Sequence, residues 1–185
     1  DAVVIAVGSD PIIPGSIPGI LKPHVFWAPD ADEDTSRIGR KVVVVGGGGG
    51  GFETALEAAD LGKDVTLIEM LNERNAKMKL SMSAGNVSRE LLSIFAKKEI
   101  PVLYGTALTE VRDGGIVTKN MATGELSQLQ CDTVLLAIGM KERWALVDEL
   151  RHSAPESNVH IVGDCRKVGT ISEAVNQAFQ ACIHI

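Results

Sequence analysis

The feature that most constrains this chain is a run of four valines that leads directly into six consecutive glycines. Residues 41–45 are mostly β-branched and apolar on both faces, which is typical of a strand in the middle of a helix-covered parallel sheet. The glycines occupy positions 46–51. A helix is expected from about residue 51 to residue 61, ended by Gly62, and a second strand at residues 64–69. Together these segments predict a strand–helix–strand unit with parallel strands.

Other periodic segments extend this pattern along the chain. Residues 107–131 alternate between β-type runs and glycines, which predicts a small antiparallel meander. Residues 9–40 contain five prolines and little periodicity, so we interpret them as a long connector. The expected fold class is α/β: a Rossmann-like parallel sheet with helices on both faces and a small antiparallel β-meander. The remaining predicted strands are residues 2–7, 101–104, 133–138 and 159–162, and the remaining predicted helices are residues 86–98, residues 144–150 and a segment from residue 170 onward.

The last helix has a clear start signal. Thr170 and Glu173 have the spacing of a capping box, in which each side chain accepts a hydrogen bond from the other residue's backbone N–H. The apolar face of this helix is expected to point inward. Its members are Ala174, Val175, Ala178 and Phe179.

The spacing of three glycines indicates a ligand. Gly46 allows a sharp turn off the strand, Gly48 has no Cβ to keep a pyrophosphate away, and Gly51 lets the helix pack closely on the sheet. The helix N-terminus offers unpaired N–H groups and a partial positive charge to phosphates. Glu69, at the end of the next strand, is placed to accept hydrogen bonds from a ribose. The pattern predicts an adenine-dinucleotide site, and a flexible loop without a ligand is the alternative.

Glu69 also bears on the choice between NADH and NADPH. A carboxylate repels the 2′-phosphate of NADPH, and NADPH sites tend to place an arginine there. NADH is therefore the expected ligand. Arg74 lies five residues further on and could reach a 2′-phosphate, so NADPH stays the second choice.

The composition argues against several other functions. The net charge is −6, without the basic patch that is typical of nucleic-acid binding. The longest apolar runs are too short to span a membrane. Cys131, Cys165 and Cys182 lack the spacing of a zinc site or a redox dithiol, and the histidines share no metal-ligand spacing, so no metal site is expected. A cytoplasmic location fits this cysteine usage best.

The order of several motifs resembles the pyridine-nucleotide-linked flavoprotein family, and most closely the C-terminal portion of 2-enoate reductases, 2,4-dienoyl-CoA reductases and trimethylamine dehydrogenase. The likeness covers nearly the whole chain. Two segments depart from the family pattern: Val7 replaces a usual threonine, and Met140–Arg143 replaces a segment that usually carries proline. The matching motifs are Asp1–Ser9 with Pro11, Ile17-Pro18-Gly19, the glycine turn with Phe52-Glu53, Val65–Met70, Asp132–Gly139, Ile161–Cys165 and the helix of residues 171–183.

This resemblance implies three parts. Residues 1–36 would be a strand and connector from the side of an FAD-binding domain, and residues 151–185 its returning strand and helix. Residues 37–150 would form the NAD(P)-binding domain. The strands at 2–7 and 159–162 should pair in parallel and carry the last helix. Because the sequence begins within a strand, a portion of a longer polypeptide is expected, and its partners would be the remaining FAD and FMN domains.

In the full protein, the resemblance implies that NADH gives a hydride to FAD, and that an iron–sulfur cluster and FMN carry electrons to a C=C bond. The chain alone is expected to bind the dinucleotide and to catalyse nothing, because the hydride acceptor lies elsewhere. Glu53 and Gly139 would lie toward the nicotinamide, and Asp164 toward the ribityl chain of the flavin. The full set of expected cofactor-binding residues is Gly46, Gly47, Gly48, Gly49, Gly50, Gly51, Glu53, Glu69, Met70, Gly139 and Asp164.

Other interpretations stay open. The chain could come from a trimmed NADH oxidase or a thioredoxin-reductase-like enzyme, or it could be a non-enzymatic module that senses NADH. Glu53 is equally well interpreted as a carboxylate in the first turn of its helix, where it suits the helix dipole. Cys165 is interpreted as a small structural or flavin-adjacent residue, and Lys141–Arg143 as a solvated loop.

Overall fold

The chain forms two compact units in a computed structural model, which describes residues 2–153, 155–183 and 185. The larger unit is Ile13–Ile138, and the smaller one combines Asp1–Ile12 with Gly139–Ile185. Asp1 of the first motif and His184 among the histidines lie outside the described residues. The units divide after residues 12 and 138, whereas the sequence-based division lies after residues 36 and 150. The assignment of the parts to FAD and NAD(P) domains stays a prediction.

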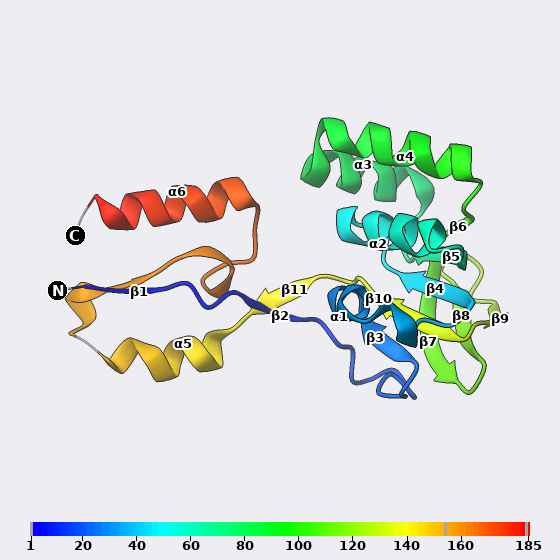
Figure 1. Ribbon diagram of the computed structural model, residues 1–185, viewed down its shortest axis with the longest axis horizontal. Coiled ribbons are helices and arrows are strands. Elements are labelled where there is room, and N and C mark those ends of the chain that lie inside the picture. The colour runs from blue at the N-terminus through cyan, green and yellow to red at the C-terminus, as the bar shows by residue number, and fades with distance from the viewer. Residues whose placement is uncertain (1, 154, 184) are drawn as a thin grey trace. The chain divides into compact units, whose positions relative to one another are not determined.

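A parallel five-stranded sheet is the centre of the larger unit (Figure 1). Each neighbouring pair of strands runs in the same direction, and β4 lies in the middle, as its apolar sequence predicts. The predicted bounds of β4 and β5 are those observed. The order across the sheet is β3 (Val25–Trp27), β10 (Thr133–Leu136), β4 (Lys41–Val45), β5 (Asp64–Glu69) and β6 (Val102–Tyr104).

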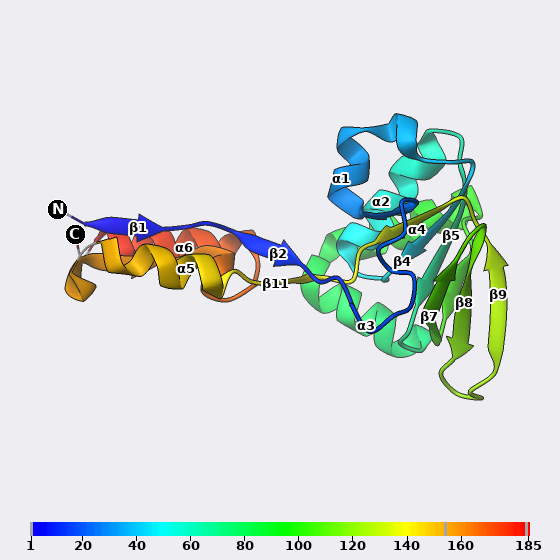
Figure 2. The same cartoon turned by 90° about the horizontal axis from the view of Figure 1, so that it is seen from below.

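Helices cover one face of this sheet (Figures 1 and 2). Val42 and Val44 of β4 pack on that side, within a core to which each of these helices contributes. The rings of Phe52 and Phe95 meet edge to face there, with their centroids 4.5 Å apart. The helices are α1 (Ala28–Glu33), α2 (Gly49–Asp60), α3 (Glu73–Ala84) and α4 (Asn86–Lys98).

An antiparallel sheet covers the opposite face. It consists of β7 (Thr106–Arg112), β8 (Gly115–Asn120) and β9 (Leu126–Gln130), which confirms the predicted meander. Val43 and Val45 of β4 pack on this side. Helices were expected on both faces of the parallel sheet, but strands cover this second face. Gly105, at φ +64°, connects β6 directly to β7, so the chain continues into the meander without a helix. The α/β fold class with a parallel sheet and a meander is confirmed.

The smaller unit is built on β1 (Val3–Ile5), which pairs in parallel with β12 (Val159–Ile161), as the family resemblance implies. Helices α5 (Trp144–Leu150) and α6 (Ile171–Cys182) lie on opposite sides of this pair (Figures 1 and 2). Its buried core contains Ile5, Val147 and Cys165. A short antiparallel ribbon joins β2 (Ser9–Pro11) to β11 (Met140–Glu142). Short 3₁₀ turns occupy Thr35–Arg37, Arg151–Ser153, Glu156–Asn158 and Gly163–Cys165.

Several local expectations are wrong. Residues 9–40 are not a plain connector, because they contain β2, β3 and α1, and Pro29 in the first turn of α1 is a start signal that could have located that helix. Helix α3 was not predicted, although the Asn72 side chain caps it by accepting a hydrogen bond from the Asn75 N–H.

Among the described residues, no helix has the length and apolarity that a membrane span needs.

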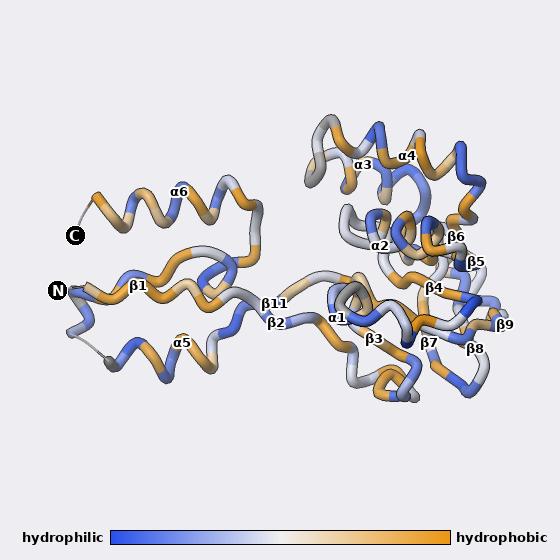
Figure 3. The backbone as a smooth tube through the Cα atoms, in the orientation of Figure 1, coloured by the Kyte–Doolittle hydropathy of each residue, from blue (hydrophilic) through white to orange (hydrophobic). Residues whose placement is uncertain are grey.

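The start of α6 is as predicted, but its expected inward face is not buried. Thr170 and Glu173 form the capping box. Val175 is 63% exposed and Phe179 is 60% exposed. Figure 3 shows apolar residues recurring along this helix. The apolar face of α6 therefore lacks a covering surface within the described part of the chain.

Candidate functional site

Two glycines of the turn after β4 are required by the fold itself. Gly46 has φ +115°, and a Cβ there would lie 2.4 Å from the backbone oxygen of Ala137 on β10's extension. A Cβ on Gly51 would lie 1.8 Å from the backbone oxygen of Gly46. Both contacts are with main-chain atoms that a side chain cannot displace cheaply. The roles of sharp turn and close packing that the sequence assigns to these glycines agree with this geometry.

Three of the four glycines between them have a different character. A Cβ on Gly48, Gly49 or Gly50 would meet no atom within 4 Å. Gly48 is the N-cap of α2 and supplies no side-chain cap, so the first-turn N–H groups of a twelve-residue helix have no side-chain acceptor at that position. Open space beside unpaired N–H groups at the positive end of a helix is what a pyrophosphate requires.

The buried carboxylate of Glu69 holds the turn from the neighbouring strand. Its Oε2 accepts a hydrogen bond from the Gly47 N–H at 2.6 Å, and its Oε1 accepts one from the Leu71 N–H at 2.7 Å. Glu69 as a whole residue is 9% exposed. A Cβ on Gly47 would lie 3.0 Å from this side chain, so glycine at that position leaves room for the acid. Glu69 keeps further lone pairs, and these are the acceptors available to a ribose.

A group of charged and phenolic side chains follows Glu69 at the same edge of the sheet. Tyr104, at the end of β6, lies opposite Glu69 in the β5–β6 register. Burial raises the pKa of the Tyr104 phenol, which also feels the charges of Lys77, Glu73 and Glu69. The Lys77 ammonium donates to Glu73 Oε1 at 2.6 Å, and this hydrogen bond is the main cause that raises the pKa of Lys77. Sequence reasoning missed this group because it did not predict α3.

Other predicted residues lie near the turn with looser constraints. Met70 follows β5 and is 57% exposed. Glu53 is exposed and is the fifth residue of α2, so it lies beyond the first turn and does not fit the interpretation as a first-turn carboxylate. Its placement toward a nicotinamide stays a prediction. Arg74 is exposed on the first turn of α3.

The last two predicted residues belong to the smaller unit. Gly139 has φ +107°, and its carbonyl accepts a hydrogen bond from the Ile12 N–H at 3.0 Å. The carboxylate of Asp164 accepts from the Ser9 hydroxyl at 3.4 Å and from the Gly169 N–H at 3.2 Å. Asp164 is therefore oriented by two segments. Its role toward a flavin stays a prediction.

Arg143 does not lie in the solvated loop that the sequence predicts, because its guanidinium is held by three hydrogen bonds. Its Nε donates to Asp10 Oδ1 at 2.8 Å, and its terminal nitrogens donate to the backbone oxygens of Val7 at 3.1 Å and Ser9 at 3.0 Å. These three contacts join the segment after β11 to β2 and the residues before it. The planar guanidinium, with several donors in a fixed fork, suits this clamp.

No disulfide joins the three cysteines. All three are free thiols. Cys165 is fully buried, and its Sγ contacts the backbone oxygens of Val162 at 3.1 Å and Ile5 at 3.4 Å, which favours the structural interpretation. Burial raises the pKa of the Cys131 thiol to about 11. Among the described residues, no group of three or more metal-binding side chains lies together.

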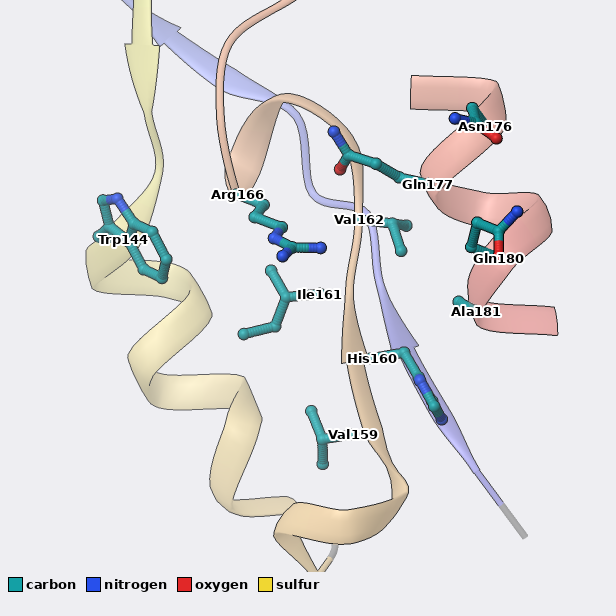
Figure 4. A pocket seen from close by; sticks show the side chains of 10 residues that line it. All are labelled: Trp144, Val159, His160, Ile161, Val162, Arg166, Asn176, Gln177, Gln180 and Ala181. Atoms are coloured by element: carbon teal, nitrogen blue, oxygen red, sulfur yellow. The ribbon is translucent and has the colours of Figure 1, made fainter. Parts of the chain in front are cut away.

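A groove of about 530 Å³ runs along β12 between α5 and α6 (Figure 4). Strand β12 pairs with β1 on one side and has no strand partner on the other side within the described residues. The groove is lined by the four residues Val159–Val162 of this segment, together with Trp144, Arg166, Asn176, Gln177, Gln180 and Ala181. An open strand edge between two helices is a place where a further strand can pair.

Comparison with known proteins gives relatives over the whole chain. The chain is 32% identical to a bilirubin reductase of Mediterraneibacter gnavus, and the match covers 98% of this chain and 27% of that protein. It is 31% identical to a cinnamate reductase of Clostridium sporogenes, with 100% of this chain covered and 26% of that protein. The chain therefore spans about a quarter of the length of these curated relatives.

The structural similarity has the same extent. A solved 2-naphthoyl-CoA reductase superimposes with a TM-score of 0.84 at 28% identity, and the match covers 98% of this chain and 26% of that one. A family model described as pyridine nucleotide-disulphide oxidoreductase matches residues 1–178. That match includes the glycine turn, Glu69, Gly139 and Asp164.

Proposed function

The chain belongs to the pyridine nucleotide-disulphide oxidoreductase family, and from this premise we propose that its larger unit binds NADH within a longer flavin-dependent oxidoreductase. One observation carries the proposal: Gly48, Gly49 and Gly50 leave open space at the uncapped N-terminus of α2, although the fold does not need glycine at these positions for steric reasons. A fold that keeps small residues where larger ones would fit is best explained by a ligand that occupies the space.

The pyrophosphate would lie against these glycines and receive hydrogen bonds from first-turn N–H groups of α2. The adenosine ribose would lie beside Glu69, whose carboxylate is already oriented by the Gly47 and Leu71 N–H groups. A carboxylate held in this way does not have to be ordered when the ribose binds, which favours affinity. The same negative charge disfavours the 2′-phosphate of NADPH.

The smaller unit would contribute to an FAD site, with Asp164 directed toward the ribityl chain and Gly139 toward the nicotinamide side. Bound NADH supplies a hydride and bound FAD accepts it, so the residues of this chain serve to bind and orient the two cofactors. Further FAD, FMN and iron–sulfur portions would lie elsewhere in the same polypeptide. The lengths of the relatives support this proposal, since each extends well beyond the matched region.

For the full protein we propose a 2-enoate-reductase-like activity on an activated C=C bond. The motif order resembles those reductases, and relatives are named as reductases of bilirubin and of cinnamate. The groove beside β12 supports a place for the rest of the FAD domain. Val175 and Phe179 of α6 are exposed as well, although they are not among the residues that line this groove, and another part of that domain would cover them.

The dinucleotide site is tested by titrating NADH into the chain and following nicotinamide fluorescence or heat. We expect saturable binding that Gly48→Val abolishes, because a branched side chain would fill the space proposed for the pyrophosphate. Gly15→Val is the matched control, since a Cβ there also meets no atom within 4 Å and lies outside the turn. Equal NADH affinity in Gly48→Val and the wild type would refute the assignment, provided that both variants unfold at the wild-type temperature.

A further inference from the structure

The charged pair on α3 lies next to the proposed ribose site and has no role in the function described so far. Helix α3 begins at Glu73, four residues after Glu69, and Lys77 follows one helical turn later. The two side chains form an i,i+4 ion pair at 2.6 Å, with 61% of the Glu73 side chain and 47% of the Lys77 side chain exposed. The pair is therefore accessible to a ligand that extends outward from Glu69.

Tyr104 connects this ion pair to the edge of the sheet at which Glu69 lies. It lies opposite Glu69 in the register of β5 and β6, so its phenol is at the carboxyl edge where the turn also lies. The phenol is within electrostatic range of Lys77, Glu73 and Glu69 at once. All four side chains belong to the larger unit, and they follow the carboxyl edge of the sheet at which the proposed ribose site lies.

We propose that Glu73 is a specificity-determining residue that selects NADH over NADPH by pairing with Lys77, a cation that would otherwise receive a 2′-phosphate. This inference rests on the proposed function, since it concerns the ligand of the same site. Glu73 acts in two ways. It neutralises Lys77, and it adds a second carboxylate outside Glu69 on the path that a 2′-phosphate would occupy.

The charge balance shows why Glu73 matters. With Glu73 present, the two acids Glu69 and Glu73 are balanced by the cations Arg74 and Lys77. A 2′-phosphate adds between one and two negative charges to this neutral group. Without Glu73, the group has one excess positive charge, and Lys77 is free to turn toward the phosphate. Because the side chains are largely exposed, water screens these interactions, and the expected change in affinity is roughly fivefold to tenfold.

The test compares two fragments, 5′-AMP and 2′,5′-ADP, as competitors of NADH on the full chain. The variants are wild type, Glu73→Gln and the double variant Glu73→Gln with Lys77→Met. We expect Glu73→Gln to tighten 2′,5′-ADP by roughly fivefold or more while 5′-AMP changes by less than about twofold. The double variant should lose most of that gain, because the freed cation is gone.

Asp60→Asn is the matched control. Asp60 pairs with Lys98 at 2.5 Å, which is an exposed pair of the same kind at the end of α2, away from the glycine turn. This variant should leave the ratio of the two fragment affinities unchanged. If Glu73→Gln also leaves the ratio unchanged while both fragments still bind, the specificity proposal is overturned and the NADH site stands. If neither NADH nor 5′-AMP binds the wild type, both proposals are overturned.

Discussion

The carboxylate of Glu69 accepts a hydrogen bond from the backbone N–H of Gly47 at 2.6 Å, across 22 positions of sequence. The acid that sequence reasoning assigned to a ribose therefore also holds the glycine turn in place. A second bond from the Leu71 N–H orients the other carboxylate oxygen. The two tasks are compatible because each oxygen can accept more than one hydrogen bond. Glu69 thus links the order of the turn to the proposed recognition of the ligand.

Replacing Glu69 by glutamine should weaken both the turn and the binding of NADH. An amide nitrogen cannot accept, so either Gly47 or Leu71 is left with an unpaired N–H, at a cost of about 1–3 kcal/mol in the free energy of unfolding. The dissociation constant for NADH should rise roughly tenfold or more. Urea unfolding and NADH titration measure the two effects. Glu90→Gln, at an exposed position of α4, should change neither.

The glycines of the turn should separate into two classes when each is replaced by alanine. Gly51→Ala places a Cβ against the Gly46 oxygen and should destabilise the fold by about 3 kcal/mol or more. Gly50→Ala places a Cβ in open space inside a helix and should stabilise the free chain by roughly 0.5–1 kcal/mol. It should nevertheless weaken NADH binding. Thermal unfolding with and without NADH measures both, and a destabilised Gly50→Ala variant would contradict the assignment of open space.

Stability should fall in alkaline solution through Cys131. Burial, and then the charge of Asp132, raise the pKa of this thiol from 9.0 to about 11. Below pH 9 the thiol is protonated in both states, and its contribution to stability is fully present. Between about pH 9 and pH 11 the unfolded chain loses the proton first, so the free energy of unfolding should fall by up to about 3 kcal/mol.

Subtracting the pH profile of Cys131→Ala isolates this contribution from that of other groups, such as Tyr104, whose pKa is also raised. The variant should be less stable than wild type at pH 8 because it leaves a small cavity, but its stability should decline less between pH 9 and pH 11. Denaturant titrations at four or five pH values give the comparison. Parallel profiles would show that Cys131 is not the group that titrates.

Loss of the Arg143 clamp should loosen the ribbon of β2 and β11. In Arg143→Gln, the contacts with Asp10 and with the carbonyls of Val7 and Ser9 are weakened or lost. Hydrogen exchange at the Ile12 N–H, which donates to Gly139, should quicken by roughly tenfold. Lys141→Gln changes an exposed residue of β11 and serves as the control. Unchanged protection of Ile12 in Arg143→Gln would mean that strand pairing alone holds the ribbon.

Segments with strong local signals were predicted closely. The bounds of β4, β5, α4 and α5 agree with those predicted, because valine runs, amphipathic periodicity and terminal glycines specify them locally. The capping box of α6 is likewise local. The elements that were missed have weaker signals. Helix α3 is mostly polar, and the strands β3 and β11 have three residues each, which is too short for periodicity to identify.

The sequence by itself determined the α/β class, the glycine turn with its acid at the end of β5, and the pairing of β1 with β12. The first two follow from local pattern, and the third follows from the family resemblance that the order of motifs carries. Only the tertiary structure decided that a meander covers the second face of the sheet, that Arg143 clamps the ribbon and that α6 leaves Val175 and Phe179 exposed. It also decided which glycines the fold requires and which leave space. These properties depend on atoms brought together from distant parts of the chain, such as the backbone of Ala137 against Gly46, and no local pattern encodes such contacts.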